Sequence, residues 1–139
     1  MRSVIADAGP LVAYFNDRDK HFSQAVAFMR EFTGPLIVTW PVLTEVCHLI
    51  PQRLVNRFMT WAARGGVVVL EIPAAALPDI AALMEKYADR PMDLADASLV
   101  WLAGQIGLTD IITVDDSDFA AYRTTSGKAF RNLLPARTK

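Results

Sequence analysis

The chain has 139 residues, of which 53% are hydrophobic, and a formal net charge of −1. This length predicts one domain with a substantial buried core, and the composition argues against intrinsic disorder. No apolar run approaches the roughly 18 residues that a membrane span needs, and a carboxylate already at Asp7 argues against a signal peptide. The single cysteine, Cys47, cannot form an internal disulfide, so we expect a reducing, cytoplasmic setting.

Short apolar strands alternate with helices through the first half of the chain. A strand over residues 3–6 ends at Asp7, and Gly9-Pro10 turns the chain into a short helix over 11–15. Further elements follow in order: a helix over 21–32, a strand over 36–39, and helices over 42–50 and 51–63. Asp7 is expected to point into the crevice above the sheet; the alternative is that it only caps the helix that follows.

Glu45 lies inside a helix whose other residues are mainly apolar. Glutamate is rarely buried without a partner, and the neighbouring helical positions have no Lys or Arg. We therefore interpret Glu45 as a metal ligand or general base. The alternative is a position at the helix rim, hydrogen-bonded to Thr44, a backbone amide or water. His48, one turn away, is interpreted as a structural histidine with satisfied hydrogen bonds.

The second half of the chain continues the alternation. The expected elements are a strand over 67–72, a helix over 74–87, a helix from about 93 to 106, a strand over 110–114, a short helix ending near Tyr122 and an edge strand within 128–133. Strands and helices that alternate in this way predict a mostly parallel sheet. The fold class is therefore α/β, one domain over residues 1–139 with a short central sheet flanked by helices on both faces.

Acidic residues gather in this half. Asp93 is well placed as a helix N-cap and is interpreted as structural, whereas Asp96 also heads the buried stripe of the same helix and is interpreted as functional. Asp115 follows the strand over 110–114, and Asp118 can rejoin it from the next turn. Such carboxylates would repel one another without a cation, and an all-oxygen set favours Mg²⁺ or Mn²⁺ over zinc.

Basic residues form two groups that are candidates for contacts with phosphate groups. Arg53 and Arg57 lie four apart on one helix face. From Tyr122 onward there are five basic residues and no acids: Arg123, Lys128, Arg131, Arg137 and Lys139. An ordinary solvated helix face is the alternative for Arg53 and Arg57. A solvated tail or a partner-docking segment is the alternative for the group after Tyr122.

Four blocks of sequence, in this order, resemble the PIN domain family and in particular its VapC-like branch. They are Val4-Ile5-Ala6-Asp7, Val42-Leu43-Thr44-Glu45, Asp96-Ala97-Ser98-Leu99-Val100 and Thr113-Val114-Asp115-Asp116-Ser117-Asp118-Phe119. The resemblance implies a metal-dependent ribonuclease, often the toxin of a type II toxin–antitoxin pair. Such toxins are usually homodimers, and an antitoxin neutralises them by placing its tail in the active-site groove.

The resemblance also implies roles for individual residues. Asp7, Glu45, Asp96 and Asp115 match the four acids that hold Mg²⁺ or Mn²⁺, with Asp118 as an auxiliary or alternative ligand. Water would attack an RNA phosphodiester in line, with Glu45 or a metal-bound hydroxide taking the proton, and the products would carry 5′-phosphate and 3′-hydroxyl ends. The two basic groups, and not the resemblance, supply the expected RNA-binding residues: Arg53, Arg57, Lys128 and Arg131.

One position departs from the family pattern. Many members have Ser or Thr two residues after the first Asp, where this chain has Gly9. This departure keeps open a PIN-like RNA-binding protein without catalysis, beside a housekeeping RNA-processing protein without a toxin role. A phospho-acceptor receiver domain is a further alternative. Such a domain would be expected to have a pair of acidic residues after the first strand, whereas this chain has only Asp7 there.

Overall fold

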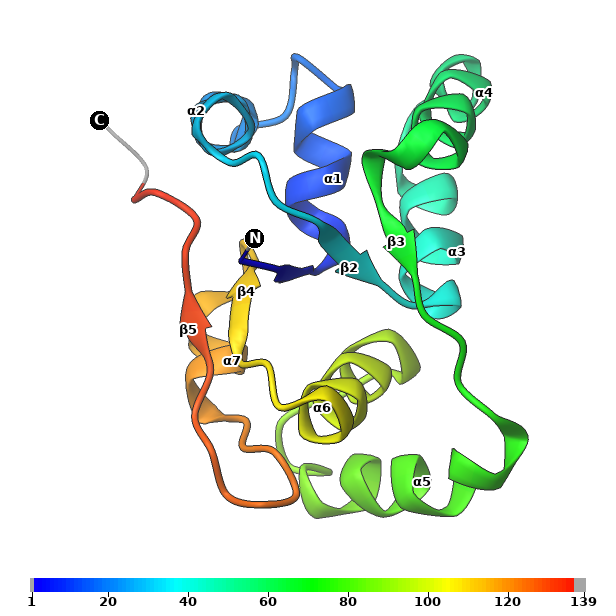
Figure 1. Cartoon of the computed structure of the whole chain (residues 1–139), viewed down its shortest axis with the longest axis vertical. Coiled ribbons are helices and arrows are strands. Elements are labelled where there is room, and N and C mark those ends of the chain that lie inside the picture. Colours follow the sequence, from blue (N-terminus) through cyan, green and yellow to red (C-terminus); the bar gives the residue numbers. More distant parts are fainter. Residues whose placement is uncertain (1, 137–139) are drawn as a thin grey trace.

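Five short parallel strands form the centre of the fold in the computed structural model, which describes residues 2–136 (Figure 1). They are β1 (Val4–Ala6), β2 (Leu36–Val38), β3 (Val68–Val69), β4 (Asp110–Ile112) and β5 (Arg131–Asn132). Their order across the sheet is β3-β2-β1-β4-β5, and every neighbouring pair is parallel. The predicted α/β class and parallel sheet are confirmed.

Helices cover both faces of this sheet. They are α1 (Ala8–Phe15), α2 (Phe22–Glu31), α3 (Trp40–Leu49), α4 (Gln52–Trp61), α5 (Leu77–Lys86), α6 (Leu94–Ile106) and α7 (Asp116–Ala121). The first four lie on one face and the last three on the other, as right-handed crossovers between parallel strands require (Figure 1). Within residues 2–136, no helix combines the length and apolar character that crossing a membrane would need.

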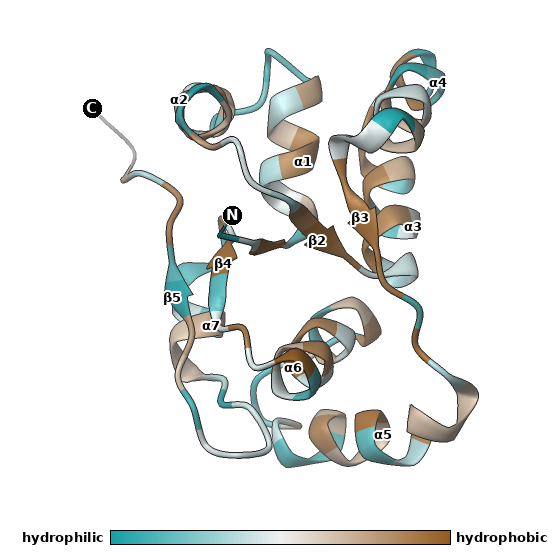
Figure 2. Cartoon of the chain, in the orientation of Figure 1, coloured by the Kyte–Doolittle hydropathy of each residue, from teal (hydrophilic) through white to brown (hydrophobic). Residues whose placement is uncertain are grey.

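β1 and β2 are apolar along their whole length, and β4 is apolar after Asp110, because helices bury these strands on both faces (Figure 2). Val4, Ile5 and Ala6 have no exposed surface, and Ile111 and Ile112 of β4 have none either. Ile5 lies opposite Ile37 on one side and Ile111 on the other. This packing holds the carboxyl ends of β1 and β4 side by side.

Several element boundaries differ from the expected ones. The strand expected over 67–72 contains only Val68–Val69, because it pairs at the sheet edge with β2, which is itself three residues long. β4 ends at Ile112, and only Arg131–Asn132 of the expected 128–133 strand pairs with it. The helix expected over 74–87 divides into a 3₁₀ turn over Ala74–Ala76 and α5.

The helix that carries Glu45 also differs from its interpretation. It starts at Trp40, which places Pro41 in the first turn, where the missing N–H costs nothing. The helix is less buried than its composition predicted, because Trp40 and Leu49 are both exposed. His48 is exposed too, so its interpretation as a satisfied structural histidine is wrong.

The strand order reverses between β1 and β4. From β1 the chain moves outward to β2 and β3, and it then crosses back to β4 and β5 on the other side. In open parallel sheets, ligands bind at such a reversal, outside the carboxyl ends of the strands. The fold therefore points to the residues that follow Ala6 and Ile112.

Candidate active site

Asp7 follows β1 directly and begins α1. Its Oδ1 accepts a hydrogen bond from the Ala8 backbone N–H at 2.9 Å, and its Oδ2 accepts one from the Thr113 hydroxyl at 2.8 Å. The side chain caps α1 and also lies at the strand reversal, so its capping role does not exclude a role in the site. Only 3% of Asp7 is exposed, and this burial raises its pKa to about 6 despite the two hydrogen bonds.

Glu45 and Asp96 approach from two helices on opposite faces of the sheet. Glu45 lies in the second turn of α3 and Asp96 in the first turn of α6, and both are half-buried. Burial raises the pKa of Glu45 to about 7, and repulsion from Asp93 and Asp7 adds to it. Burial likewise raises the pKa of Asp96 to about 8, with Asp7, Asp93 and Glu45 contributing. The carboxylates therefore share one electrostatic environment.

The two candidate acids after β4 differ in their surroundings. Asp115 is partly exposed at the start of α7, and its pKa is raised by burial and then by the charges of Asp118 and Asp93. Asp118 Oδ1 instead lies 2.9 Å from Arg90 Nη1 in an ion pair. Arg90 therefore compensates the charge of Asp118, whereas Asp115 stays a candidate for the fourth acid with a raised pKa.

Asp93 has a larger part in the site than the sequence suggested. Its Oδ1 accepts a hydrogen bond from the Asp96 backbone N–H at 2.8 Å, which confirms its interpretation as the N-cap of α6. Its charge also raises the pKa of Asp7, Glu45 and Asp96. We call Asp7, Glu45, Asp93, Asp96 and Asp115 the acidic cluster.

Three polar side chains that sequence reasoning did not select position the acidic cluster. Thr113 bonds Asp7 and also accepts a hydrogen bond from the Asp115 backbone N–H at 2.9 Å. The buried hydroxyls of Thr39 and Ser98 lie 2.7 Å apart and join the start of α3 to α6. Thr113 and Ser98 stand inside the sequence blocks quoted above, so a hydroxyl next to a selected acid was the available signal.

The chemistry of the acidic cluster fits a hard divalent cation. It offers carboxylate oxygens from several chain segments, the ligands that Mg²⁺ and Mn²⁺ prefer. The raised pKa values mean that these charges are not compensated by the protein alone. Within residues 2–136, no three Asp, Glu, His or Cys side chains are grouped so as to hold one ion as they stand.

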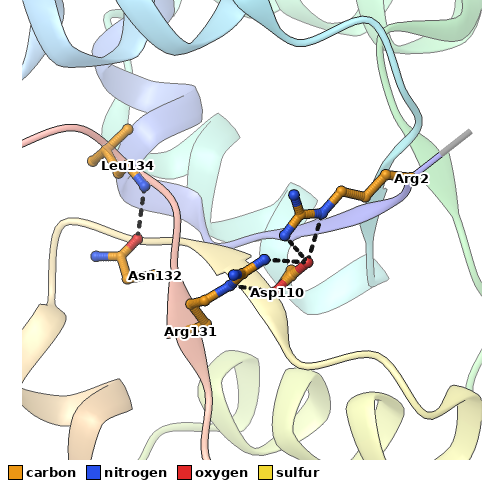
Figure 3. A network of polar contacts seen from close by, with 5 residues as sticks. All are labelled: Arg2, Asp110, Arg131, Asn132 and Leu134. Carbon is orange, nitrogen blue, oxygen red and sulfur yellow. Dashed lines mark hydrogen bonds and ion pairs between the residues drawn. The ribbon is translucent and has the colours of Figure 1, made fainter.

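The candidate RNA-binding residues are not brought together. Arg53 and Arg57 are exposed on α4, and Lys128 is exposed in the loop before β5. Arg131 lies at the amino end of β5, opposite the edge that holds the acidic cluster. There it pairs with Asp110, Nε to Oδ1 at 3.0 Å, next to Arg2 (Figure 3). The further basic residues Arg137 and Lys139 lie outside the described residues.

Val114 leaves no space for a side chain at position 9, which is occupied by Gly9. A Cβ added at this position would lie 2.4 Å from Val114 Cγ2, closer than real contacts allow. The hydroxyl that many family members carry at this position therefore has no room here without a shift of Val114. Thr113 supplies a hydroxyl to Asp7 from the other strand.

Comparisons with known proteins show which proteins this chain is similar to. A family model described as the PIN domain matches residues 4–124. Ribonuclease VapC26 of Mycobacterium tuberculosis (strain ATCC 25618 / H37Rv) is 26% identical over 131 residues, which cover 91% of this chain and 97% of that protein. The crystal structure of Mycobacterium tuberculosis VapC20, a sarcin–ricin loop cleaving toxin, matches with a TM-score of 0.70 and 18% identity, covering 83% of this chain and 93% of VapC20.

These matches decide between the families considered. The structural likeness to VapC20 shows a shared fold, and the relative VapC26 confirms the resemblance to the VapC-like branch. The receiver-domain alternative is wrong, because a different family model accounts for most of the chain. This protein belongs to the PIN domain family.

Proposed function

We propose that this protein is a Mg²⁺- or Mn²⁺-dependent ribonuclease and the toxin of a type II toxin–antitoxin pair. The observation that carries the proposal is the acidic cluster, whose members come from both faces of the sheet and raise one another's pKa at the strand reversal. Membership of the PIN domain family and the likeness to a ribonuclease named VapC26 support the same activity.

The residues divide into distinct tasks in this reaction. Asp7, Glu45, Asp96 and Asp115 would hold the cation, which supplies a water of lowered pKa and compensates charge on the phosphate. Glu45 lines an open hollow beside α3, so it is the member that we expect to accept a proton from the attacking water. Asp7 is fixed by its two hydrogen bonds and orients the cluster rather than moving.

The proposed path of the RNA outside the acidic cluster is inferred from the positions of exposed basic side chains. The exposed side chains of Arg53, Arg57 and Lys128 would contact backbone phosphates of a longer RNA. Arg131 would have to leave Asp110 to do so. Replacing both Arg53 and Arg57 with Ala should weaken RNA binding and make its salt dependence shallower, whereas Arg131→Ala should change neither as much.

The proposed partners rest on the resemblance of the sequence to VapC-like proteins. We expect a cytoplasmic homodimer that an antitoxin neutralises. Sedimentation of the purified protein tests the dimer. Growth arrest on expression, relieved by co-expression of the protein encoded next to it, tests the toxin role and separates it from housekeeping RNA processing.

Cleavage assays on purified protein test the activity itself. Asp7→Asn and Asp96→Asn should each abolish Mg²⁺- or Mn²⁺-dependent RNA cleavage while circular dichroism shows a folded protein. Asp79→Asn, which removes an exposed carboxylate on α5, is the matched control and should cleave normally. Normal cleavage by both site variants would refute the assignment. Mn²⁺ binding that needs these carboxylates, without cleavage of any RNA by the wild type, would favour the non-catalytic RNA-binding alternative.

A further inference from the structure

Trp40 presents a large apolar surface to solvent beside the acidic cluster. It is the first residue of α3, and 55% of it is exposed. Leu94, the first residue of α6, is 46% exposed, and both side chains line the same hollow. Adjacent exposed apolar side chains of this size typically mark a place where a ligand or a partner binds.

The hollow next to Trp40 joins this apolar surface to the reacting carboxylates. Its volume is about 520 Å³, within the roughly 300–1,000 Å³ of small-ligand sites. The hollow is lined by both apolar and polar residues: Trp40, Pro41 and Leu94, and Glu45, Asp93 and His48. Whatever fills the hollow therefore touches an indole ring and a carboxylate of the acidic cluster together.

We propose that this hollow binds one nucleobase of single-stranded RNA, stacked on the Trp40 ring, next to the phosphate that is cut. The inference rests on the proposed ribonuclease function and names a residue that positions its substrate. Every nucleobase offers a π-face to an aromatic side chain, and such stacking is a main source of affinity for single-stranded RNA.

The charges around the hollow favour a base over other parts of the RNA. Glu45 and Asp93 repel a phosphate that enters without a cation, whereas an uncharged base avoids this repulsion. Amino groups on a base edge can donate to these carboxylates, and the exposed imidazole of His48 adds a donor or an acceptor. The base would lie in the hollow while its phosphate lies at the acidic cluster.

A second copy of the chain is the main competing occupant. Trp40 and Leu94 also line a neighbouring hollow of about 320 Å³ that includes Leu77, which is 58% exposed. A protein partner would cover both hollows, because its apolar surface would extend over all three side chains. A base would fill only the hollow that contains Glu45, so the two occupants differ in their dependence on Leu77.

Binding of short RNAs to a cleavage-deficient protein tests the proposal. Each variant is made in an Asp96→Asn background, and the probes are 12-nucleotide homopolymers and the same RNAs with one abasic position. Trp40→Ala should weaken binding of at least one intact homopolymer by about 5-fold or more. Trp40→Phe should restore most of this binding, and Leu77→Ala, the matched control, should bind like the parent. An abasic position should weaken binding to the parent but add little to Trp40→Ala.

A spectroscopic measurement separates stacking from a merely structural role. Trp40 is exposed, while Trp101 is buried and Trp61 is half-buried. Nucleosides, which carry no phosphate, should quench tryptophan fluorescence of the parent, and Trp40→Phe should remove most of this quenching. Unchanged RNA affinity of Trp40→Ala, or unchanged quenching of Trp40→Phe, would overturn the proposal.

Two further outcomes have distinct meanings. The first is a sedimentation result in which Trp40→Ala and Leu77→Ala both abolish self-association of the chain. This result would mean that a second copy covers this face, and it would overturn the proposal. If the wild-type protein, which retains Asp96, cleaves no RNA with any divalent ion, the proposed function is refuted. That result would still leave base stacking measurable, because the binding probes do not require cleavage.

Discussion

The Thr113 hydroxyl donates a 2.8 Å hydrogen bond to Asp7 Oδ2, so the residue after β4 fixes the residue after β1. The same hydroxyl accepts from the Asp115 backbone N–H at 2.9 Å. Both strands end at this point, and neither Asp7 nor Thr113 has more than 3% of its surface exposed. The buried Thr113 hydroxyl oxygen therefore fixes the positions of Asp7 and Asp115 relative to each other, although the two acids are distant in sequence.

We expect Thr113→Val to destabilise the protein and to impair cleavage. Valine keeps the shape but leaves the buried Asp7 carboxylate without one hydrogen bond, at a cost of about 1–3 kcal/mol in the free energy of unfolding. Urea denaturation measures this change, and RNA cleavage reports the displaced acids. Thr113→Ser retains the hydroxyl and should stay close to the wild type. Equal stability of Thr113→Val and Thr113→Ser would show that the hydrogen bond contributes nothing.

The metal-free protein should lose stability as the pH rises from about 4 to about 8. The folded-state pKa values of Asp7, Glu45 and Asp96 are raised to about 6, 7 and 8. Protons therefore bind the folded state more tightly, so unfolding becomes easier as these groups ionise. For the buried Asp7 alone the effect is roughly 3 kcal/mol.

Thermal unfolding in EDTA at pH 5 and pH 8 measures this dependence. Mn²⁺ should raise the unfolding temperature much more at pH 8 than at pH 5, because it compensates carboxylates that are ionised only at the higher pH. Asp96→Asn should flatten the pH dependence and reduce the Mn²⁺ effect. A metal-free protein that is more stable at pH 8 than at pH 5 would contradict the proposed electrostatics.

Sequence patterns were sufficient where a local rule places the residue. Asp7 was selected because it follows a buried apolar strand, and Glu45 because it interrupts an apolar helix. The cap role of Asp93 is likewise local, since it depends only on the next three residues. Its influence on Glu45 depends on how α3 and α6 pack across the sheet, and no local pattern contains that information.

Features that depend on strand register were not accessible from the sequence. Arg131 was expected to bind RNA, but the register of β4 with β5 sets it opposite Asp110, where their charges pair. Asn132, the next residue, instead bonds the backbone of Thr113 at both its N–H and C=O groups. Arg131 and Asn132 are neighbours on β5, yet the first contacts the amino end of β4 and the second contacts the residue after its carboxyl end. Charge and composition alone do not predict this difference.

We expect Gly9→Ser to reduce stability, although serine is common at this position in the family pattern. The added Cβ would meet Val114 Cγ2, and overpacking of this kind costs about 1–3 kcal/mol. Val114→Ala should relieve the clash, so the double variant should be more stable than the sum of the single changes predicts. Urea denaturation of all four proteins gives this coupling energy. Strict additivity would show that Val114 does not keep position 9 free of a side chain.

Asp118→Asn should affect metal binding much less than Asp115→Asn. Asp118 is already paired with Arg90 at 2.9 Å, whereas Asp115 forms no ion pair within residues 2–136. The pKa of Asp115 is raised by burial and then by the charges of Asp118 and Asp93, with only His21 opposing the shift. Calorimetric titration with Mn²⁺ should show at least a ~10-fold loss of affinity for Asp115→Asn and a loss below ~3-fold for Asp118→Asn. Arg90→Ala is the informative companion, because it frees the Asp118 carboxylate and should strengthen Mn²⁺ binding. If Asp118→Asn proved the more damaging change, the fourth acid would be Asp118, and the ion pair with Arg90 would have to open when the metal binds.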